Sequence, residues 1–432
     1  PPPAAGGLMP ALSPLVLLLV CWGLTVAVAC LALAAPEAFD LVPVFMARHD
    51  LDPAAFTGLG ALWHVTALSA WVVGHLAACA ALPRRVATRS VPDLSRAAWL
   101  TFLANLVLLA VTLLWIGLTA RQLGGLRALV ILTTAEAITA REFLLQNKLF
   151  TGMRLFYAAL PATGCLAAAI LVAGRDRLSR RARALCRATL LMNLVALTLL
   201  PIVMSQRLLL LQFTLSAYLA ACLIRRRVFA LPWLMTGAAL FLTVWVLRET
   251  LINPAVATQA VPVGLQKLAF YTVNDLWNGF APISSDVPRT WGAETFHGLA
   301  VLTFTDGLVD HAILPLAPAI DAVRGGGAFP IFTAPYVDFG PFGGAIVLVG
   351  LSFGLRLLFH RAQTSFLATI AYAQFGAALL FSSHGPYLLH QNLLASLIVV
   401  AVILRLARPA VRTRAEIIPL FLPRREMARD AA

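Results

Sequence analysis

Apolar residues run along most of the chain in long blocks that only short polar segments interrupt. Each block has roughly 17 residues or more, the length that a helix needs to cross a hydrocarbon core about 30 Å thick. We therefore expect about ten transmembrane helices, at residues 11–35, 57–82, 97–120, 155–174, 188–204, 208–224, 228–247, 341–359, 364–383 and 388–407. This pattern predicts an all-α polytopic membrane protein.

The connections between these blocks divide the chain into three parts. Residues 1–247 are expected to form a bundle of seven helices with an outer loop at 121–154. Residues 341–432 are expected to form three helices and a basic cytoplasmic tail. The segment 248–340 between them is far longer than an ordinary connection, so we expect a large extracytoplasmic loop subdomain there.

Composition and charge narrow the class of protein. Hydrophobic residues make up 60% of the 432 residues and charged residues only 12%, which excludes an ordinary soluble enzyme. The net charge of +14 does not indicate nucleic acid, because 22 of the 33 Lys and Arg residues but only 5 of the 19 acidic residues fall on one side of the predicted topology. Such an excess marks the cytoplasmic side, where we place both termini. The six cysteines form no CxxC pair and no Gly-Lys pair exists, so we expect no cysteine metal site, no P-loop and no cofactor.

One arginine lies at the tip of an outer hairpin. Met204 to Arg207 joins the fifth and sixth spans, whose arms are slightly shorter than the hydrocarbon is thick. We expect Arg207 near the depth of the lipid phosphates, where its planar guanidinium can form bidentate bonds to a lipid-linked phosphate or diphosphate. The alternative is an arginine that snorkels to the interface and anchors the hairpin.

The first part of the long outer segment combines carboxylates, amides and aromatic rings. This mixture is typical of sugar binding, because aromatic faces stack on sugar rings while polar side chains form directional bonds to hydroxyls. The residues that carry the pattern are Tyr271, Asn274, Asp275, Trp277, Arg289, Trp291, Glu294 and His297. The candidate bases for deprotonating a sugar hydroxyl are Glu294, His297, Asp275 and Asp310. The alternative for any one of these residues is an interfacial aromatic belt or a solvated loop.

Three later residues are further candidates. Arg324 precedes three glycines, which permit close backbone approach, and it is either a phosphate ligand or part of a flexible turn. Asp338 lies just before a span, where it is either a base or a helix cap. His384, in the outer loop at 382–387, is another candidate base or a solvated histidine.

The first outer loop is acidic. It contains Glu37, Asp40, Asp50 and Asp52. Oxygen ligands of this kind can hold a divalent cation, although Asp52 before Pro53 is also typical of a helix start.

The order of these features resembles the bacterial O-antigen polymerase (Wzy-type) family of oligosaccharide repeat-unit polymerases. The likeness begins with Ser205-Gln206-Arg207 and the basic cluster Arg225 to Arg227. It continues through Tyr271 and Asn274 to Gly292–Phe296, and ends with Thr333 to Gly343 at the start of the next span. It covers roughly residues 200–400, and Tyr336-Val-Asp338-Phe-Gly340 is its most specific element.

The resemblance implies a metal-independent glycosyltransferase with a GT-C-like membrane architecture. Such an enzyme transfers a growing glycan from polyprenyl diphosphate to the non-reducing end of a lipid-linked repeat unit, on the periplasmic face of the bacterial inner membrane. The implied partners are that lipid-linked oligosaccharide, membrane lipids, a flippase and a chain-length regulator. The implied diphosphate ligands are Arg207, Arg289 and Arg324, with Arg248 in reserve. One of Glu294, Asp338 and His384 is the implied base, and the sugar-binding residues are Tyr271, Asn274, Asp275, Trp277, Trp291 and Tyr336.

Other functions fit the same pattern. A glycosyltransferase that uses a polyprenyl monophosphate sugar would employ Asp40, Asp50 and Asp52 as metal ligands and base, and would be sensitive to a chelator. An O-antigen ligase would differ only in its acceptor. A lipid-linked oligosaccharide flippase or transporter belongs to another class, and transport into proteoliposomes would reveal it.

Overall fold

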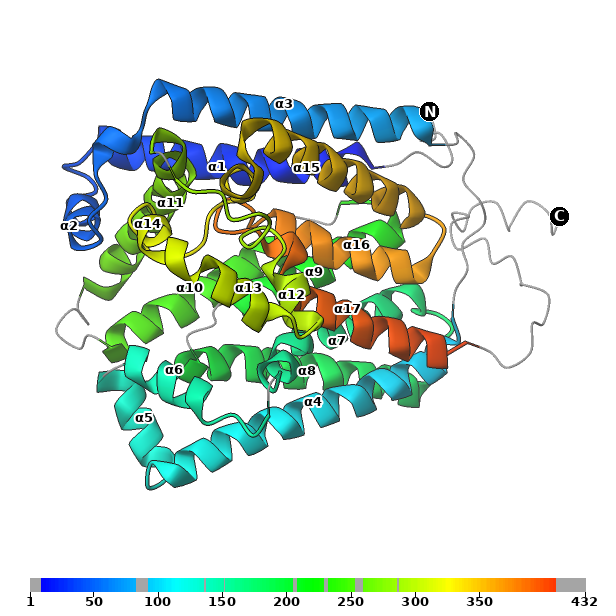
Figure 1. The fold of residues 1–432 in the computed structure, drawn as a ribbon. Helices are drawn as coiled ribbons and strands as arrows, with labels where there is room; N and C mark the ends of the chain where they lie inside the picture. The colour runs from blue at the N-terminus through cyan, green and yellow to red at the C-terminus, as the bar shows by residue number, and fades with distance from the viewer. Residues whose placement is uncertain are drawn as a thin grey trace.

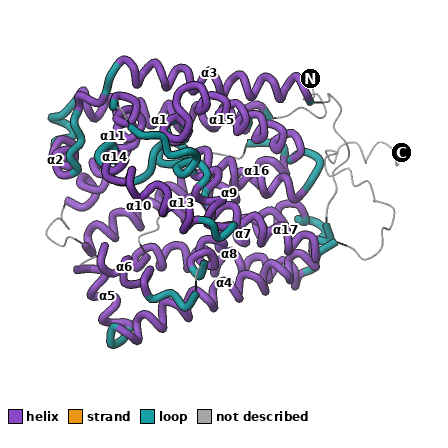
Figure 2. Tube along the Cα trace, viewed as in Figure 1, coloured by secondary structure: helices purple, strands orange, loops and turns teal. Residues whose placement is uncertain are grey.

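The computed structural model describes residues 9–82, 92–135, 137–150, 152–204, 208–228, 232–252, 259–285 and 287–408. The regular elements in these ranges are helices, and no β-strand occurs in them (Figures 1 and 2). Seven of the described helices are long and apolar enough to cross a membrane. They are α1 (Pro14–Ala34), α3 (Gly58–Ala81), α4 (Leu94–Gln122), α7 (Arg154–Ala173), α8 (Arg180–Met204), α9 (Leu208–Arg225) and α15 (Ala334–Arg361). The predicted helical membrane protein is confirmed at this level.

The other three predicted spans are helical but have shorter apolar stretches. They correspond to α10 (Pro232–Ile252), whose apolar part is Leu234–Leu247, to α16 (Phe366–Leu379) and to α17 (Gln391–Leu406). A count of ten spans therefore stays a prediction. In Figure 1, α1 begins and α17 ends at the same end of the bundle, and Asp93 at the start of α4 bonds there to the carbonyl of Ala407.

The turn between α16 and α17 lies deeper in the bundle than the sequence suggested. Ser383 accepts a 2.8 Å hydrogen bond from Thr25, the twelfth residue of α1. At 1.5 Å per residue, Thr25 is roughly 17 Å from the first residue of a helix about 31 Å long. The turn, expected at an outer tip, thus packs beside the middle of α1, because α16 has only 14 residues and α17 only 16.

Helix α15 is broken near its start. Gly340 has φ 72° and ψ −174°, and Pro341 follows it. A positive φ suits glycine, and proline is favoured at the first position of a new helix because it has no amide hydrogen to leave unpaired. The break separates Ala334–Phe339 from the long span and exposes backbone groups of Val337 and Asp338 to the preceding loop.

The remaining elements are one long helix and a set of short helices and 3-10 turns. They are α2 (Leu41–Arg48), α5 (Leu126–Ala135), α6 (Ala137–Gln146), α11 (Ala260–Ser284), α12 (His297–Leu302), α13 (Asp306–Ile313), α14 (Ala317–Asp321) and the short 3-10 turns Pro10–Leu12, Pro53–Ala55, Leu314–Leu316 and Tyr387–Leu389. Within the segment 248–340, α11 packs against α1, α2 and α3 and shares a hydrophobic core with α1 and α2. The division of the chain at 248 and 340 stays a prediction, but α11 is an integral part of the bundle.

Candidate functional site

Asp338 joins the broken start of α15 to the loop before α12. Its carboxylate is fully buried and accepts three hydrogen bonds, from the Thr290 hydroxyl, from the Glu294 amide at 3.0 Å and from the Thr295 amide at 2.7 Å. The Asp338 carbonyl accepts a further bond from the Trp291 amide. The carboxylate does not cap its own helix, as one interpretation of the sequence had it. With three donors around it, it is better suited to hold the loop than to take a proton from a substrate.

Glu294 is held by that loop and faces Arg324. Its Oε1 lies 2.5 Å from Arg324 Nη2, and the two side chains are 16% and 26% exposed. Burial raises the pKa of Glu294 above its ordinary value, the adjacent guanidinium lowers it in part, and the nearby Asp338 carboxylate raises it. The Arg324 guanidinium also lies over the Phe329 ring, 4.7 Å from its centroid. The pair therefore presents a proton acceptor and a cation in direct contact.

Arg289, in the loop between α11 and α12, lies beside the break in α15. Its Nη1 donates to the Tyr336 carbonyl at 2.8 Å, and its guanidinium carbon is 5.0 Å from the centroid of the Tyr336 ring. The Tyr336 ring also packs against Trp63, with centroids 4.9 Å apart. These contacts hold the guanidinium beside Gly340, where a Cβ would lie 3.5 Å from the guanidinium carbon.

A second pair of ionisable side chains consists of an aspartate on α11 and a histidine in the turn between α16 and α17. Nδ1 of His384 is 2.7 Å from Oδ1 of Asp275, a side chain with only 9% exposure. The imidazole lies between the Tyr271 ring, at 6.0 Å between centroids, and the stacked Tyr387 ring, at 6.2 Å. Because Nδ1 faces the carboxylate, the ring orientation is fixed and Nε2 is the nitrogen left for a substrate.

The glycine segment after Arg324 connects the two pairs. The Gly325 amide donates to Asn278 Oδ1 at 2.7 Å, and Asn274 Nδ2 donates to the Gly326 carbonyl at 2.8 Å. A Cβ at Gly325 would lie 2.2 Å from a methyl group of Leu51 and 2.8 Å from Asn274 Oδ1. Only glycine fits this approach, as the sequence had suggested.

Several buried polar atoms of this site have no hydrogen-bond partner among the described residues. They are Asn274 Oδ1, Asn278 Nδ2, Thr295 Oγ1 and Arg324 Nε. Buried polar groups in proteins are nearly always paired, so a cluster of unpaired donors and acceptors indicates a place that water or a polar ligand completes. Sugar hydroxyls, which donate and accept, match both kinds of group.

The structure does not bring every predicted sugar-binding residue into this site. Trp277 is 5% exposed and donates its indole N–H to the Asp52 carbonyl at 2.9 Å, so it packs the core beside the first outer loop. Trp291 is 79% exposed, with φ 53°, and projects from the loop that Asp338 holds. Arg207 lies outside the described residues, and of Arg248 only the backbone, in α10, is described.

The first-loop acids have local partners. Asp40 accepts from Gln266 at 2.8 Å, and Asp52 accepts from the Ala54 amide at 2.8 Å, which is the predicted helix start. No three His, Cys, Asp or Glu side chains in the described ranges converge as metal ligands would. His297 and Asp310 form an exposed pair, with Nε2 of His297 3.2 Å from Oδ1 of Asp310.

Two contributors to the site could not be assigned from the sequence. Asn278, by contrast, ends the amide-bearing stretch that was expected to bind sugar, and it lies four residues after Asn274 on the same helix face. Thr290 and Tyr387 carry no comparable signal, since their contacts with Asp338 and His384 depend on how distant segments pack.

Comparison with known proteins adds no relative to this picture. No known protein family, no curated protein and no solved structure matches this chain.

Proposed function

We propose that this chain is a glycosyltransferase that transfers a glycan from polyprenyl diphosphate to the non-reducing end of a lipid-linked repeat unit, on the extracytoplasmic face of a bacterial inner membrane. One observation carries the proposal: the partly buried ion pair of Glu294 and Arg324, whose Arg324 Nε and neighbouring Thr295 Oγ1 are unpaired, belongs to an otherwise apolar helical bundle. Such a site suits a substrate with a charged head, polar hydroxyls and a lipid tail. The GT-C-like architecture and the family resemblance are part of the same proposal.

The two members of the pair would have complementary tasks. An incoming diphosphate competes with Glu294 for the Arg324 guanidinium, which forms strong charge-assisted bonds to phosphate oxygens. The freed Glu294 carboxylate then accepts the proton of the acceptor hydroxyl, while the oxygen of that hydroxyl bonds to the anomeric carbon of the transferred glycan. The bond from that carbon to the diphosphate breaks, and the diphosphate leaves with the electron pair. Arg324, with Arg289 nearby, stabilises the charge that develops on it.

Asp275 and His384 offer a second proton acceptor. Asn274 and Asn278, on the same helix as Asp275, bond to the glycine segment that follows Arg324, and the Asp275 carboxylate orients the imidazole. We assign the base to Glu294 because it touches the phosphate-binding arginine directly. A His384→Gln variant that abolishes turnover while Glu294→Gln does not would reverse this assignment.

The test uses the purified full chain in lipid with a polyprenyl-diphosphate-linked repeat unit, in the presence and absence of EDTA. We expect a ladder of longer glycans on a gel, with free polyprenyl diphosphate released, in both conditions. Folded protein that forms no ladder from the cognate repeat unit would contradict the polymerase. A single transfer to a different lipid would indicate a ligase, and loss of the ladder with EDTA would contradict the metal-independent mechanism.

A transporter of lipid-linked oligosaccharide is the second candidate, and two features favour it. Helix α15 is broken at Gly340, and α16 and α17 meet halfway along α1. Broken helices around a central polar site are typical of secondary transporters. Proteoliposomes loaded on one side with a fluorescent lipid-linked oligosaccharide separate the two functions, because a transporter moves the lipid without lengthening its glycan.

A further inference from the structure

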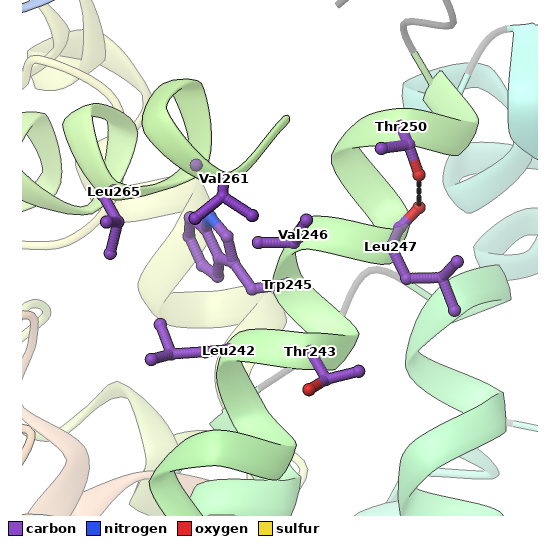
Figure 3. A pocket seen from close by; sticks show the side chains of 9 residues that line it. Leu242, Thr243, Trp245, Val246, Leu247, Thr250, Val261 and Leu265 are labelled. Carbon is purple, nitrogen blue, oxygen red and sulfur yellow. Dashed lines mark hydrogen bonds between the residues drawn. The ribbon is translucent and has the colours of Figure 1, made fainter. Parts of the chain in front are cut away.

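An apolar groove of about 510 Å³ lies between α10 and α11, beside the polar site (Figure 3). Its lining comes from the end of α10 and the start of α11: Leu242, Thr243, Trp245, Val246, Leu247, Thr250, Val261, Gly264 and Leu265. The only polar side chains among these are two threonines and the indole of Trp245. The Thr250 hydroxyl donates to the Leu247 carbonyl at 2.7 Å, so it does not need a partner in the groove.

Contacts between aromatic rings connect the groove to His384 of the polar site. Trp245 is 6% exposed, and its ring meets the edge of Tyr271 with centroids 5.4 Å apart. Tyr271 in turn packs against His384 at 6.0 Å. The inner end of the groove is thus two ring contacts away from the pair of His384 and Asp275.

One face of α11 runs from the groove to this pair. Gly264, Lys267, Tyr271, Asp275 and Asn278 follow one another at intervals of three or four residues, which places them on the same side of a helix. The distance along the axis from Gly264 to Asp275 is roughly 17 Å. Lys267 forms a 2.7 Å ion pair with Glu249, which ties α11 to α10 beside the groove.

Gly264 keeps the groove open. A Cβ there would lie 3.3 Å from a Val246 methyl group and 3.4 Å from Trp245 Cδ1. Val261 and Leu265 flank it and are 57% and 50% exposed, so the groove opens to the outside of the bundle.

We infer that this groove binds the isoprenoid tail of the lipid-linked substrate and that the α11 face directs the attached head group to the polar site. The inference rests on the proposed function for the identity of the lipid. An apolar tail gains by burial against these side chains. Along one face of α11 the surface changes from apolar to polar. The substrate changes in the same order, from its apolar tail to the polar head group attached to it.

The first experiment measures binding without turnover. The full chain in lipid is photo-crosslinked with a diazirine-bearing polyprenyl phosphate, and the labelled residues are mapped by mass spectrometry. We expect labels on α10 and α11 around Val261 that excess unlabelled polyprenyl diphosphate removes. Labels that phosphatidylglycerol removes equally well, or labels on other helices, would overturn the inference.

The second experiment fills the groove. Val261→Trp adds volume at a half-exposed position, and Val107→Trp, at the 50% exposed Val107 of α4, is the matched control. We expect Val261→Trp to raise the KM for a long-chain polyprenyl substrate about tenfold, while a farnesyl analogue and the control change little. An equal effect on both tail lengths, or none, would overturn the inference.

The two experiments separate the groove from the reaction. Crosslinks near Val261 that unlabelled polyprenyl diphosphate removes, in protein that forms no glycan ladder, would support lipid binding in the groove and contradict the transferase. A ladder from wild-type protein, together with no label near Val261, would support the transferase and contradict the groove.

Discussion

Two buried polar clusters in this bundle differ in charge and in backbone. In the first, Asn105 of α4, Thr163 of α7 and Asn193 of α8 meet, with 2.7 and 2.9 Å hydrogen bonds to Asn105 Oδ1. All three side chains are neutral and project from unbroken stretches of helix. In the second, Glu294, Arg324, Asp338, Asp275 and His384 are ionisable, and most come from loops, a turn or a broken helix.

The difference in charge indicates that the neutral cluster serves helix packing, whereas the ionisable cluster serves chemistry. Neutral side chains that bond across helices hold transmembrane bundles together and need no other role. Ionisable groups in an apolar bundle are costly to bury, so their presence there indicates a task. Irregular backbone around them adds donors and acceptors that a regular helix would use for itself.

The substitution Glu294→Gln should have the largest effect. The amide keeps the shape but takes no proton, so we expect glycan transfer to fall roughly 100- to 10,000-fold. Initial rates of ladder formation measure this. Matched thermal unfolding of both proteins is the control, and an unchanged rate would remove Glu294 from the mechanism.

The pH dependence sharpens the same assignment. Because burial raises the pKa of Glu294, its proton-accepting form should be lost at a higher pH than for an ordinary carboxyl group. The transfer rate should therefore fall as the pH decreases through this raised pKa. In Glu294→Gln the residual rate should lack this acidic limb, and an identical limb in both proteins would point to another group.

Arg324→Ala should have the next largest effect. Loss of one preorganised cation at the developing charge is expected to lower the rate roughly 100- to 1,000-fold. The exposed Arg181 of α8 is the matched control, since Arg181→Ala changes the net charge equally without touching the site. Comparable losses from both substitutions would mean that only overall charge matters.

Asp338→Asn should affect folding as well as rate. The new amide nitrogen faces an N–H group instead of accepting from it, so one buried donor loses its partner and the free energy of unfolding should fall by about 2 kcal/mol. Denaturation in detergent measures this. A variant as stable as wild type would show that Asp338 does not hold the loop of Thr290 and Glu294.

Asn105→Ala, in the neutral cluster, should have the smallest effect. Interhelical hydrogen bonds in membranes contribute about 0.6 kcal/mol on average. We expect a slight loss of stability and the normal glycan ladder. A large loss of transfer activity from this variant would erase the distinction between the two clusters.

The sequence predicted much of the fold but only part of the site. Apolar blocks located the seven helices that are long and apolar enough to cross a membrane, because the length of such a helix is set locally by the thickness of the hydrocarbon. The glycines after Arg324 and the side chains of Asn274, Asp275, Glu294 and His384 were recognised from their types. Trp277 was misleading, since an aromatic in a polar stretch can equally well face the core.

Hydropathy and residue type are local properties, so the amino-acid sequence alone predicts a helical membrane protein and identifies the polar residues that are candidates for its chemistry. Which of these candidates meet depends on the three-dimensional fold. His384 and Asp275 are 109 residues apart, and Arg324 and Glu294 are 30 apart. Their pairing depends on the break at Gly340 and on the turn of α16 and α17 halfway along α1. A glycine followed by a proline encodes the break locally, but which distant segments meet at the break and at the turn depends on how the helices pack against one another.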